Sequence, residues 1–292
     1  ADVCKQLDIL GKADAAVIKA QQELDMLTLE RYLATMHTAT AADLQQEPIN
    51  QLFYNRLLAG GRKESFYNGK ICELPSILLN FDELKHLKWR INGLEYNKTL
   101  AQAFDAATRI LAPTANATYA AVVAHADAHN GNVWYNQNGG LTLFDPAFAG
   151  QNIPALLAEV KASFHNIFAH PLWLYDSAEA KFEVAAKLKG DFIEIEHNWQ
   201  LGSLREEFLK SKQNLLWKPL LEKLGYPKGW QEYVRHALFC CPTLVMNLRS
   251  GAGNANNSHT PQTSALGFAI AIMLASAPVS GKDVVSDFFG QI

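Results

Sequence analysis

His125-Ala126-Asp127-Ala128-His129-Asn130-Gly131-Asn132 is followed by a short apolar run, a Gly139-Gly140 turn and the segment Leu141-Thr142-Leu143-Phe144-Asp145. Residues 133–135 and 141–144 are rich in β-forming side chains and flank a glycine-containing turn, which predicts a hairpin. The hairpin would place Asn132 where one strand begins and Asp145 where its partner ends. Because the two ends of a hairpin lie side by side, we expect both side chains to reach one ion.

The types and spacing of these polar residues favour phosphoryl transfer. A histidine, an aspartate two residues later and an asparagine five residues after that follow the H-x-D-x-x-x-x-N spacing of a kinase catalytic loop. Such a transfer needs an oriented hydroxyl and cations that neutralise charge on the transferred group. We predict that Asp127 accepts the proton of a substrate hydroxyl, and that Asn132 and Asp145 hold Mg²⁺ beside ATP. His125 and His129 are expected to support the loop structurally.

The same residues carry a resemblance to a known family. Residues 125–132 look like the H-G-D-x-H-x-x-N motif of the aminoglycoside phosphotransferase and choline kinase-like family, and Phe144-Asp145 resembles its following I-D segment. Residues 33–37 resemble a helix that ends in Leu-His in the same lobe. The resemblance implies a protein-kinase-like fold, with Asp127 as the catalytic aspartate and Asn132 and Asp145 as magnesium ligands. It also implies a transferase that phosphorylates a hydroxyl group of a small molecule.

We predict an α+β fold that is predominantly helical, a single protein-kinase-like C-terminal lobe over residues 1–292 with short β-hairpins. The lobe would be helical over 1–119, carry the catalytic loop and hairpin over 120–150, and be helical with one hairpin over 151–292. Helical periodicity and capping residues predict helices at 12–37, 49–59, 99–111, 153–175, 203–224, 230–247 and 263–277. A second hairpin is predicted around the turn at 189–191.

The segment before His125 lacks the parts that cover ATP in a complete kinase. Those parts are a phosphate loop, a strand lysine and a helix glutamate, carried by a β-rich N-terminal lobe. The residues before His125 read mainly as helix, and Lys70, the nearest candidate lysine, is expected in an exposed turn. We therefore expect the N-terminal lobe to be a missing partner of this chain, which alone would turn over ATP weakly or not at all.

Composition narrows the class of protein. With 49% hydrophobic and 19% charged residues, the chain has the composition of a soluble globular protein. A net charge of −3 without a long basic run disfavours a nucleic-acid partner. The N-terminus has no apolar signal core, and the apolar stretch at 264–277 is shorter than the ~20 residues that span a bilayer, so a membrane partner is disfavoured. The four cysteines, Cys4, Cys72, Cys240 and Cys241, are expected to be reduced thiols of a cytoplasmic protein.

Two other functions stay open. His125, Asp127 and His129 alternate, so an extended backbone would place all three on one face, where they could ligate a metal such as Zn²⁺ for hydrolysis. A further ligand would come from Asp145, His165 or His170. The second alternative is a non-catalytic kinase-like binding module. Tightly bound zinc would favour the hydrolase, whereas Mg²⁺ bound only with nucleotide would favour the kinase.

Overall fold

The computed structural model describes residues 2–136, 140–169, 171–175, 181–252 and 258–292. The chain has an α+β fold, about 51% helical and 19% strand, with several small sheets, which confirms the predicted fold class at that level. The helices are α1 (Asp2–Leu10), α2 (Ala15–Thr35), α3 (Ala41–Gln46), α4 (Tyr54–Leu57), α5 (Arg62–Tyr67), α6 (Phe81–Leu84), α7 (Leu100–Ile110), α8 (Val160–Ser163), α9 (Pro171–Leu174), α10 (Ser203–Ser211), α11 (Lys218–Leu224), α12 (Trp230–Val245), α13 (Pro261–Ala275) and α14 (Val284–Gly290). Two 3-10 turns, η1 (Pro48–Gln51) and η2 (Asn130–Asn132), and two π-helical turns, η3 (Phe164–Phe168) and η5 (Lys212–Trp217), complete the helical structure of the described residues.

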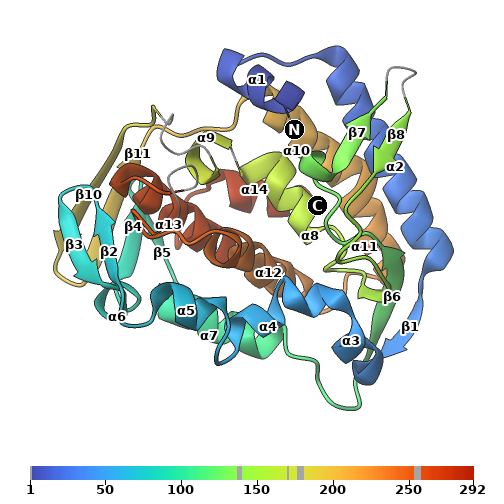
Figure 1. The fold of residues 1–292 in the computed structure, drawn as a ribbon, viewed down its shortest axis with the longest axis horizontal. Coiled ribbons are helices and arrows are strands. Elements are labelled where there is room, and N and C mark those ends of the chain that lie inside the picture. Colours follow the sequence, from blue (N-terminus) through green and yellow to red (C-terminus); the bar gives the residue numbers. More distant parts are fainter. Residues whose placement is uncertain (1, 137–139, 170, 176–180, 253–257) are drawn as a thin grey trace.

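The strands form small sheets at two sides of the molecule (Figure 1). They are β1 (His37–Thr40), β2 (Ile71–Leu74), β3 (Ile77–Asn80), β4 (Lys88–Ile91), β5 (Leu94–Tyr96), β6 (Thr118–Ala124), β7 (Val133–Tyr135), β8 (Leu141–Leu143), β9 (Gly150–Pro154), β10 (Val184–Lys189) and β11 (Phe192–His197). Sheet orders are β1-β6-β9, β10-β11-β4-β5, β2-β3 and β7-β8. Every pairing is antiparallel except that of β11 with β4.

The central strand β6 delivers the chain to the candidate site. Antiparallel β1 and β9 flank it, and its register pairs Ala121 with both His37 and Pro154. The register with β9 shifts between Val122 and Ala124, where β6 ends and the loop at His125 begins. A shift of this kind bends a strand and redirects the side chains that follow it. The sheet therefore fixes the starting point of the loop but not the direction of its side chains.

Helices α12 and α13 pack together in the middle of the molecule, between the β10-β11-β4-β5 sheet and the β6 sheet (Figure 1). Every residue of α13 from Thr263 to Ala275 is buried, which explains why its sequence is apolar on all sides. The buried apolar residues form one contiguous cluster that includes both helices. Within the described part of the chain, no helix is both long and apolar enough to cross a membrane.

Several predicted elements are confirmed where local signals are strong. Helix α7 begins after Thr99, whose hydroxyl accepts a hydrogen bond from the Gln102 amide in a reciprocal capping box. Helix α2 begins at Ala15 because the Asp14 carboxylate accepts hydrogen bonds from two backbone amides of its first turn. Both predicted hairpins, β7–β8 and β10–β11, are present. The centre of the first turn, residues 137–139, lies outside the described residues.

The prediction that residues 1–119 are helical is wrong, because strands β1 to β5 and the start of β6 lie there. Strands β4 and β5 are joined by Asn92-Gly93, with φ values of 47° and 79°. Asn-Gly is the preferred pair for a two-residue hairpin turn of this hand. The predicted helix at 49–59 is instead the 3-10 turn η1 followed by the short α4.

The predicted helix at 153–175 is also wrong. Its first residues end strand β9, which pairs with β6 through contacts that no local sequence pattern encodes. The remainder is divided among α8, η3 and α9, with residue 170 outside the description. The predicted helix at 203–224 has the expected extent but contains the π-helical turn η5. Such turns occur frequently at functional sites.

Candidate functional site

The predicted loop leaves β6 through a strained backbone. Ala126 has a φ of 62° and Asp145 a φ of 56°, both in the left-handed region that costs energy for residues with a β-carbon. The two residues sit next to His125 and Phe144, which contact each other. Strain of this kind persists where surrounding contacts fix the chain, and it gathers at active sites and ligand clamps.

Two hydrogen bonds join the loop to the segment that ends in Asp145, and a third links Asn132 to Asp127 within the loop. His125 Nε2 donates to the Phe144 carbonyl at 2.8 Å, so this nitrogen carries the proton. The Phe144 amide donates to the Asn132 carbonyl at 3.1 Å. The Asn132 side-chain amide donates to the backbone carbonyl of Asp127 at 2.9 Å. Asp127 and Asn132 are thus directly linked. Asp145 follows Phe144, whose backbone amide and carbonyl are both hydrogen-bonded to the loop.

The carboxylate of Asp127 is held by a lysine that the sequence reasoning missed. Lys161 Nζ, on α8, lies 2.9 Å from Asp127 Oδ1, and the two side chains are only 8% and 9% exposed. A buried ion pair needs good geometry to offset the loss of hydration of both charges. The one available signal was a lysine within the run 153–164, which is apolar apart from Glu159, Lys161 and Ser163. The ammonium group fixes one oxygen of the carboxylate.

His129 supports the loop in a neutral form. Its Nδ1 accepts a hydrogen bond from the Gly131 amide at 3.0 Å, and its Nε2 lies 3.6 Å from Asp127 Oδ1. Burial lowers the pKa of His129 from 6.5 to about 4, so the ring is uncharged at neutral pH. Its ring packs 4.6 Å from that of His165, whose Nδ1 lies 2.8 Å from the Tyr175 hydroxyl. Half-buried His129 and buried His165 therefore form a structured wall of the loop.

A chain of buried amides anchors the far side of the loop. The Asn130 amide donates to Asn166 Oδ1 at 2.9 Å, and Asn166 Nδ2 donates to Gln21 Oε1 at 3.3 Å. Gln21 Nε2 in turn donates to Asp25 Oδ1 at 2.8 Å, and Lys212 Nζ lies 2.7 Å from that oxygen. The loop is thereby connected to helix α2 and to the π-helical turn η5. Buried polar networks that are fully satisfied make the groups they contact rigid.

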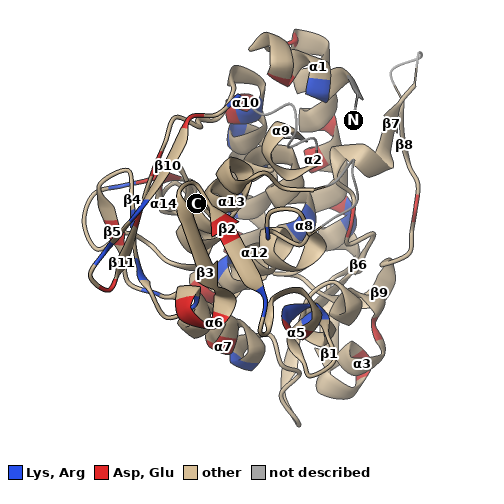
Figure 2. Cartoon of the chain, turned by 60° about the vertical axis from the view of Figure 1, so that its left-hand side comes forward, with Lys and Arg blue, Asp and Glu red and all other residues tan. Residues whose placement is uncertain are grey.

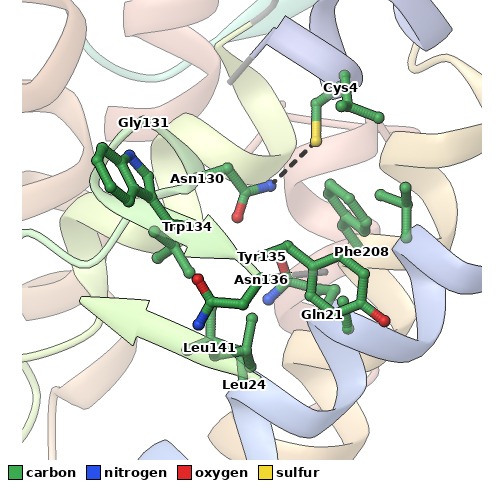
Figure 3. Close-up of a pocket in the computed structure, with 14 residues that line it drawn as sticks. Cys4, Gln21, Leu24, Asn130, Gly131, Trp134, Tyr135, Asn136, Leu141 and Phe208 are labelled. Carbon is green, nitrogen blue, oxygen red and sulfur yellow. Dashed lines mark hydrogen bonds between the residues drawn. The ribbon is translucent and has the colours of Figure 1, made fainter. Parts of the chain in front are cut away.

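A pocket of about 620 Å³ lies beside the loop, between hairpin strand β7 and helices α1 and α2. Figure 3 shows Asn130 pointing its amide toward Cys4 Sγ, at 3.7 Å, with Trp134 and Tyr135 at the hairpin side of the pocket. Trp134 is 64% exposed, and its ring centroid lies 5.2 Å from that of Phe144. This exposed tryptophan lies two residues after Asn132, and the sequence reasoning did not single it out.

The three alternating side chains do not form the metal site that a hydrolase would need. The left-handed backbone at Ala126 interrupts the extended conformation on which that alternative depended. His125 is bonded to the Phe144 carbonyl and His129 to the Gly131 amide. In the described ranges, no group of three or more His, Cys, Asp or Glu side chains could hold a metal ion. His170, a suggested ligand, lies outside them.

Comparison of the chain with protein-family models, curated proteins and solved structures finds no match. Asn132 offers an amide oxygen that accepts no hydrogen bond from the described residues, and the Asp145 side chain is exposed. Oxygen donors of this kind suit Mg²⁺, which commonly takes one or two carboxylates and completes its shell with substrate phosphates and water. In the chemistry of their donor atoms, Asn132 and Asp145 fit such an ion.

Proposed function

We propose that this chain is the helical lobe of a phosphotransferase that moves the γ-phosphoryl group of ATP to a hydroxyl of a small molecule. The observation that supports it most directly is the hydrogen-bonded link between residues 127–132 and Phe144. That link joins a buried carboxylate, a free amide oxygen and the segment leading to an exposed carboxylate. The three groups are those that phosphoryl transfer requires beside a metal–nucleotide complex.

In this proposal Asp127 orients the acceptor and takes its proton. The hydroxyl oxygen forms a bond to the γ-phosphorus, the bond to the leaving oxygen of ADP breaks, and the hydroxyl proton passes to the free oxygen of the Asp127 carboxylate. Lys161 holds the other oxygen at 2.9 Å and so fixes the direction of the free one. Asn132 and Asp145 would hold Mg²⁺, which neutralises charge on the phosphates when it is bound. Lys161 is a positioning residue in this scheme.

The nucleotide would lie along the exposed side of the hairpin. Trp134 presents its ring to solvent and packs on Phe144, next to Asp145. Aromatic faces bind nucleobases by stacking, at about 1–3 kcal/mol per base. A base stacked on Trp134 would direct its phosphates toward Asp145. The proposed missing N-terminal lobe would cover the opposite face of the base.

Binding of MgATP to the purified chain tests the proposal, because turnover by this chain alone is expected to be weak. Isothermal titration calorimetry should detect binding that requires Mg²⁺ and is lost in Asp145→Asn. The matched control is Asp191→Asn, which changes an exposed aspartate in the distant β10–β11 turn and should bind normally. Absence of Mg²⁺-dependent nucleotide binding in the wild-type chain would contradict the proposal, as would equal effects of the two substitutions.

Asp127→Asn separates catalysis from binding. The variant should bind MgATP as the wild type does but lose any transfer to an acceptor, because an amide cannot accept the hydroxyl proton. Release of ADP in the presence of candidate acceptors measures this loss. If Asp127→Asn keeps wild-type transfer, another group is the base. If function in the complete protein survives Asp127→Ala, the chain is a binding module instead.

A further inference from the structure

A second pocket, of about 420 Å³, opens between α4, α5 and the loop that follows Asp145. Two arginines line it, Arg56 from α4 and Arg62 from α5, together with Phe148 from the loop. Phe148 comes three residues after Asp145, so the pocket borders the candidate site along the chain. It is separate from the pocket that Trp134 lines.

The two guanidinium groups converge on the C-terminal end of α12. Nη1 of Arg56 donates to the Leu244 carbonyl at 3.2 Å, and Nη1 of Arg62 donates to the same carbonyl at 2.8 Å. Arg62 Nη1 also donates to the Val245 carbonyl at 3.0 Å. Capping of the helix end accounts for the Nη1 atom of each arginine. The Nε and Nη2 atoms of both arginines have no hydrogen-bond acceptor among the described residues.

Little negative charge balances this pair. Burial and the neighbouring Arg62 together lower the pKa of Arg56 to about 10, and Asp127 is the one carboxylate among the groups that act to raise it. Burial alone accounts for the lowered pKa of Arg62. The nearby Glu64 carboxylate accepts a hydrogen bond from the Gly60 amide at 2.7 Å. Two half-buried cations without an ion-pair partner among the described residues provide an electrostatic site for an anion.

Arg56 also belongs to the electrostatic surroundings of the candidate base. The charges of Lys161, Asp127 and Arg56 all act on the pKa of the buried Cys241 thiol on α12, so the three lie within electrostatic range of one group. Lys and Arg positions colour parts of both α5 and α8 blue in Figure 2. An anion held by Arg56 would therefore lie in a pocket that borders the loop after Asp145 through Phe148.

We propose that Arg56 and Arg62 bind a phosphate or carboxylate group of the acceptor, so that the hydroxyl substrate is itself an anion. This inference rests on the proposed function for its assignment to the acceptor. Guanidinium groups bind such oxyanions through paired, charge-assisted hydrogen bonds, and two converging guanidiniums can hold one anion from two directions. The free Nε and Nη2 groups would be the donors. Phe148 would cover the carbon skeleton between the anion and the hydroxyl.

Inorganic phosphate is the probe for the anion pocket, and Ser65→Glu is the decisive variant. Ser65 lines the pocket and is exposed, so a glutamate there adds negative charge without removing either arginine contact to α12. Calorimetric titration should show phosphate binding to the wild type, and at least about tenfold weaker binding to Ser65→Glu because of charge repulsion. Ser280→Glu, which adds the same charge at an exposed serine outside the pocket, should bind phosphate normally.

MgATP titrations of the same variants assign the anion to its source. Unchanged MgATP binding in Ser65→Glu, alongside weakened phosphate binding, supports the acceptor assignment. A parallel loss of MgATP binding overturns it, because the arginines would then hold nucleotide phosphates. If MgATP does not bind the wild type but phosphate does, the proposed function fails while the anion pocket stands. If phosphate does not bind the wild type, or binds Ser65→Glu equally well, the pocket itself is refuted.

Discussion

Lys212→Met should destabilise the fold more than other single changes of a lysine in this chain. Lys212 Nζ lies 2.7 Å from Asp25 Oδ1 and forms a second ion pair with Glu159. The side chain of Lys212 is 1% exposed, and those of Asp25 and Glu159 are 0% and 2% exposed. Methionine fills a similar volume but leaves two carboxylates buried together without a cation. The Tyr32 hydroxyl, 3.1 Å from Glu159, compensates only as a neutral donor.

The expected magnitude follows from the charges left behind. Removing one partner of a buried ion pair costs about 3–5 kcal/mol because the other charge stays desolvated. Because Lys212→Met leaves two carboxylates without a cation, its loss in free energy of unfolding should reach or exceed the upper value. That loss is a large part of the 5–15 kcal/mol by which domains are stable. At ~2 °C per kcal/mol for a chain of this size, the melting temperature should fall by about 10 °C. Urea unfolding followed by circular dichroism measures the free energy directly.

The pH dependence of Lys212→Met provides the sharper test. Burial holds the pKa of Glu159 above its ordinary value even beside Lys212, and loss of the ammonium group raises it further. When folding raises the pKa of a carboxyl group, that group lowers the free energy of unfolding as pH rises from its pKa in the unfolded chain to its pKa in the folded chain. Relative to wild type at the same pH, the variant should therefore recover stability between pH 7 and pH 5. A deficit that is equal at both values would refute the reasoning.

Two further variants complete that test. The triple variant Lys212→Met/Asp25→Asn/Glu159→Gln removes all three charges together, so it should be more stable than Lys212→Met alone. Lys210→Met changes an exposed lysine that pairs with Glu207 and lies in the last turn of α10. It should leave the unfolding midpoint unchanged. A loss below ~1 kcal/mol in Lys212→Met, or a triple variant no more stable than the single one, would show that the ion pairs carry little energy.

Three other substitutions probe the loop and its surroundings. In Gly131→Ala the new β-carbon would meet the His129 ring at 2.5 Å. The free energy of unfolding in urea should therefore fall by about 1–3 kcal/mol. Wild-type stability of this variant would show that the ring moves freely. Trp134→Ala should leave the melting temperature nearly unchanged, since the side chain is 64% exposed, but weaken MgATP binding in calorimetry by about 1–3 kcal/mol; unchanged affinity would remove Trp134 from the nucleotide site. Because the pKa of His129 falls to about 4 on folding, its stabilising contribution is lost as pH falls from about 6.5 toward 4, by about 2 kcal/mol at pH 5. His129→Asn should therefore show a smaller drop in urea midpoint between pH 7 and pH 5 than wild type, and an identical drop would contradict this.

The sequence predicted best those elements whose signals are local. Thr99 marks the start of α7 through its own capping bonds, and α13 is buried on every side as its uniformly apolar residues require. Strand β9 could not be predicted in this way. It contains polar residues and ends at Pro154, and it becomes a strand because β6 lies beside it. The hairpin at Asn92-Gly93, in contrast, had a clear local signal that was overlooked.

The same difference between local signals and tertiary packing applies to the residues of the candidate site. Asp127 and Asn132 come from one short loop, so their spacing alone was enough to single them out. Lys161 reaches Asp127 from 34 residues away, and its approach depends on how α8 packs. Arg56 reaches the same surroundings from α4, through anchoring to the end of α12. Such partners are set by tertiary packing. A single sequence contains no periodic pattern or motif that indicates which distant residues will meet.

Under the proposed function, the two substrates approach the loop from different sides. Arg56 and Phe148 line the pocket on the α4–α5 side, where the acceptor would bind, whereas Trp134 lines the pocket on the hairpin side, where the nucleotide would bind. Phosphoryl transfer requires the attacking and leaving oxygens to lie roughly in line through phosphorus. Entry from two sides would allow that alignment without a large movement of the loop. The buried anchors at Lys161 and Asn166 then serve a common purpose, because they hold the loop still between the two substrates.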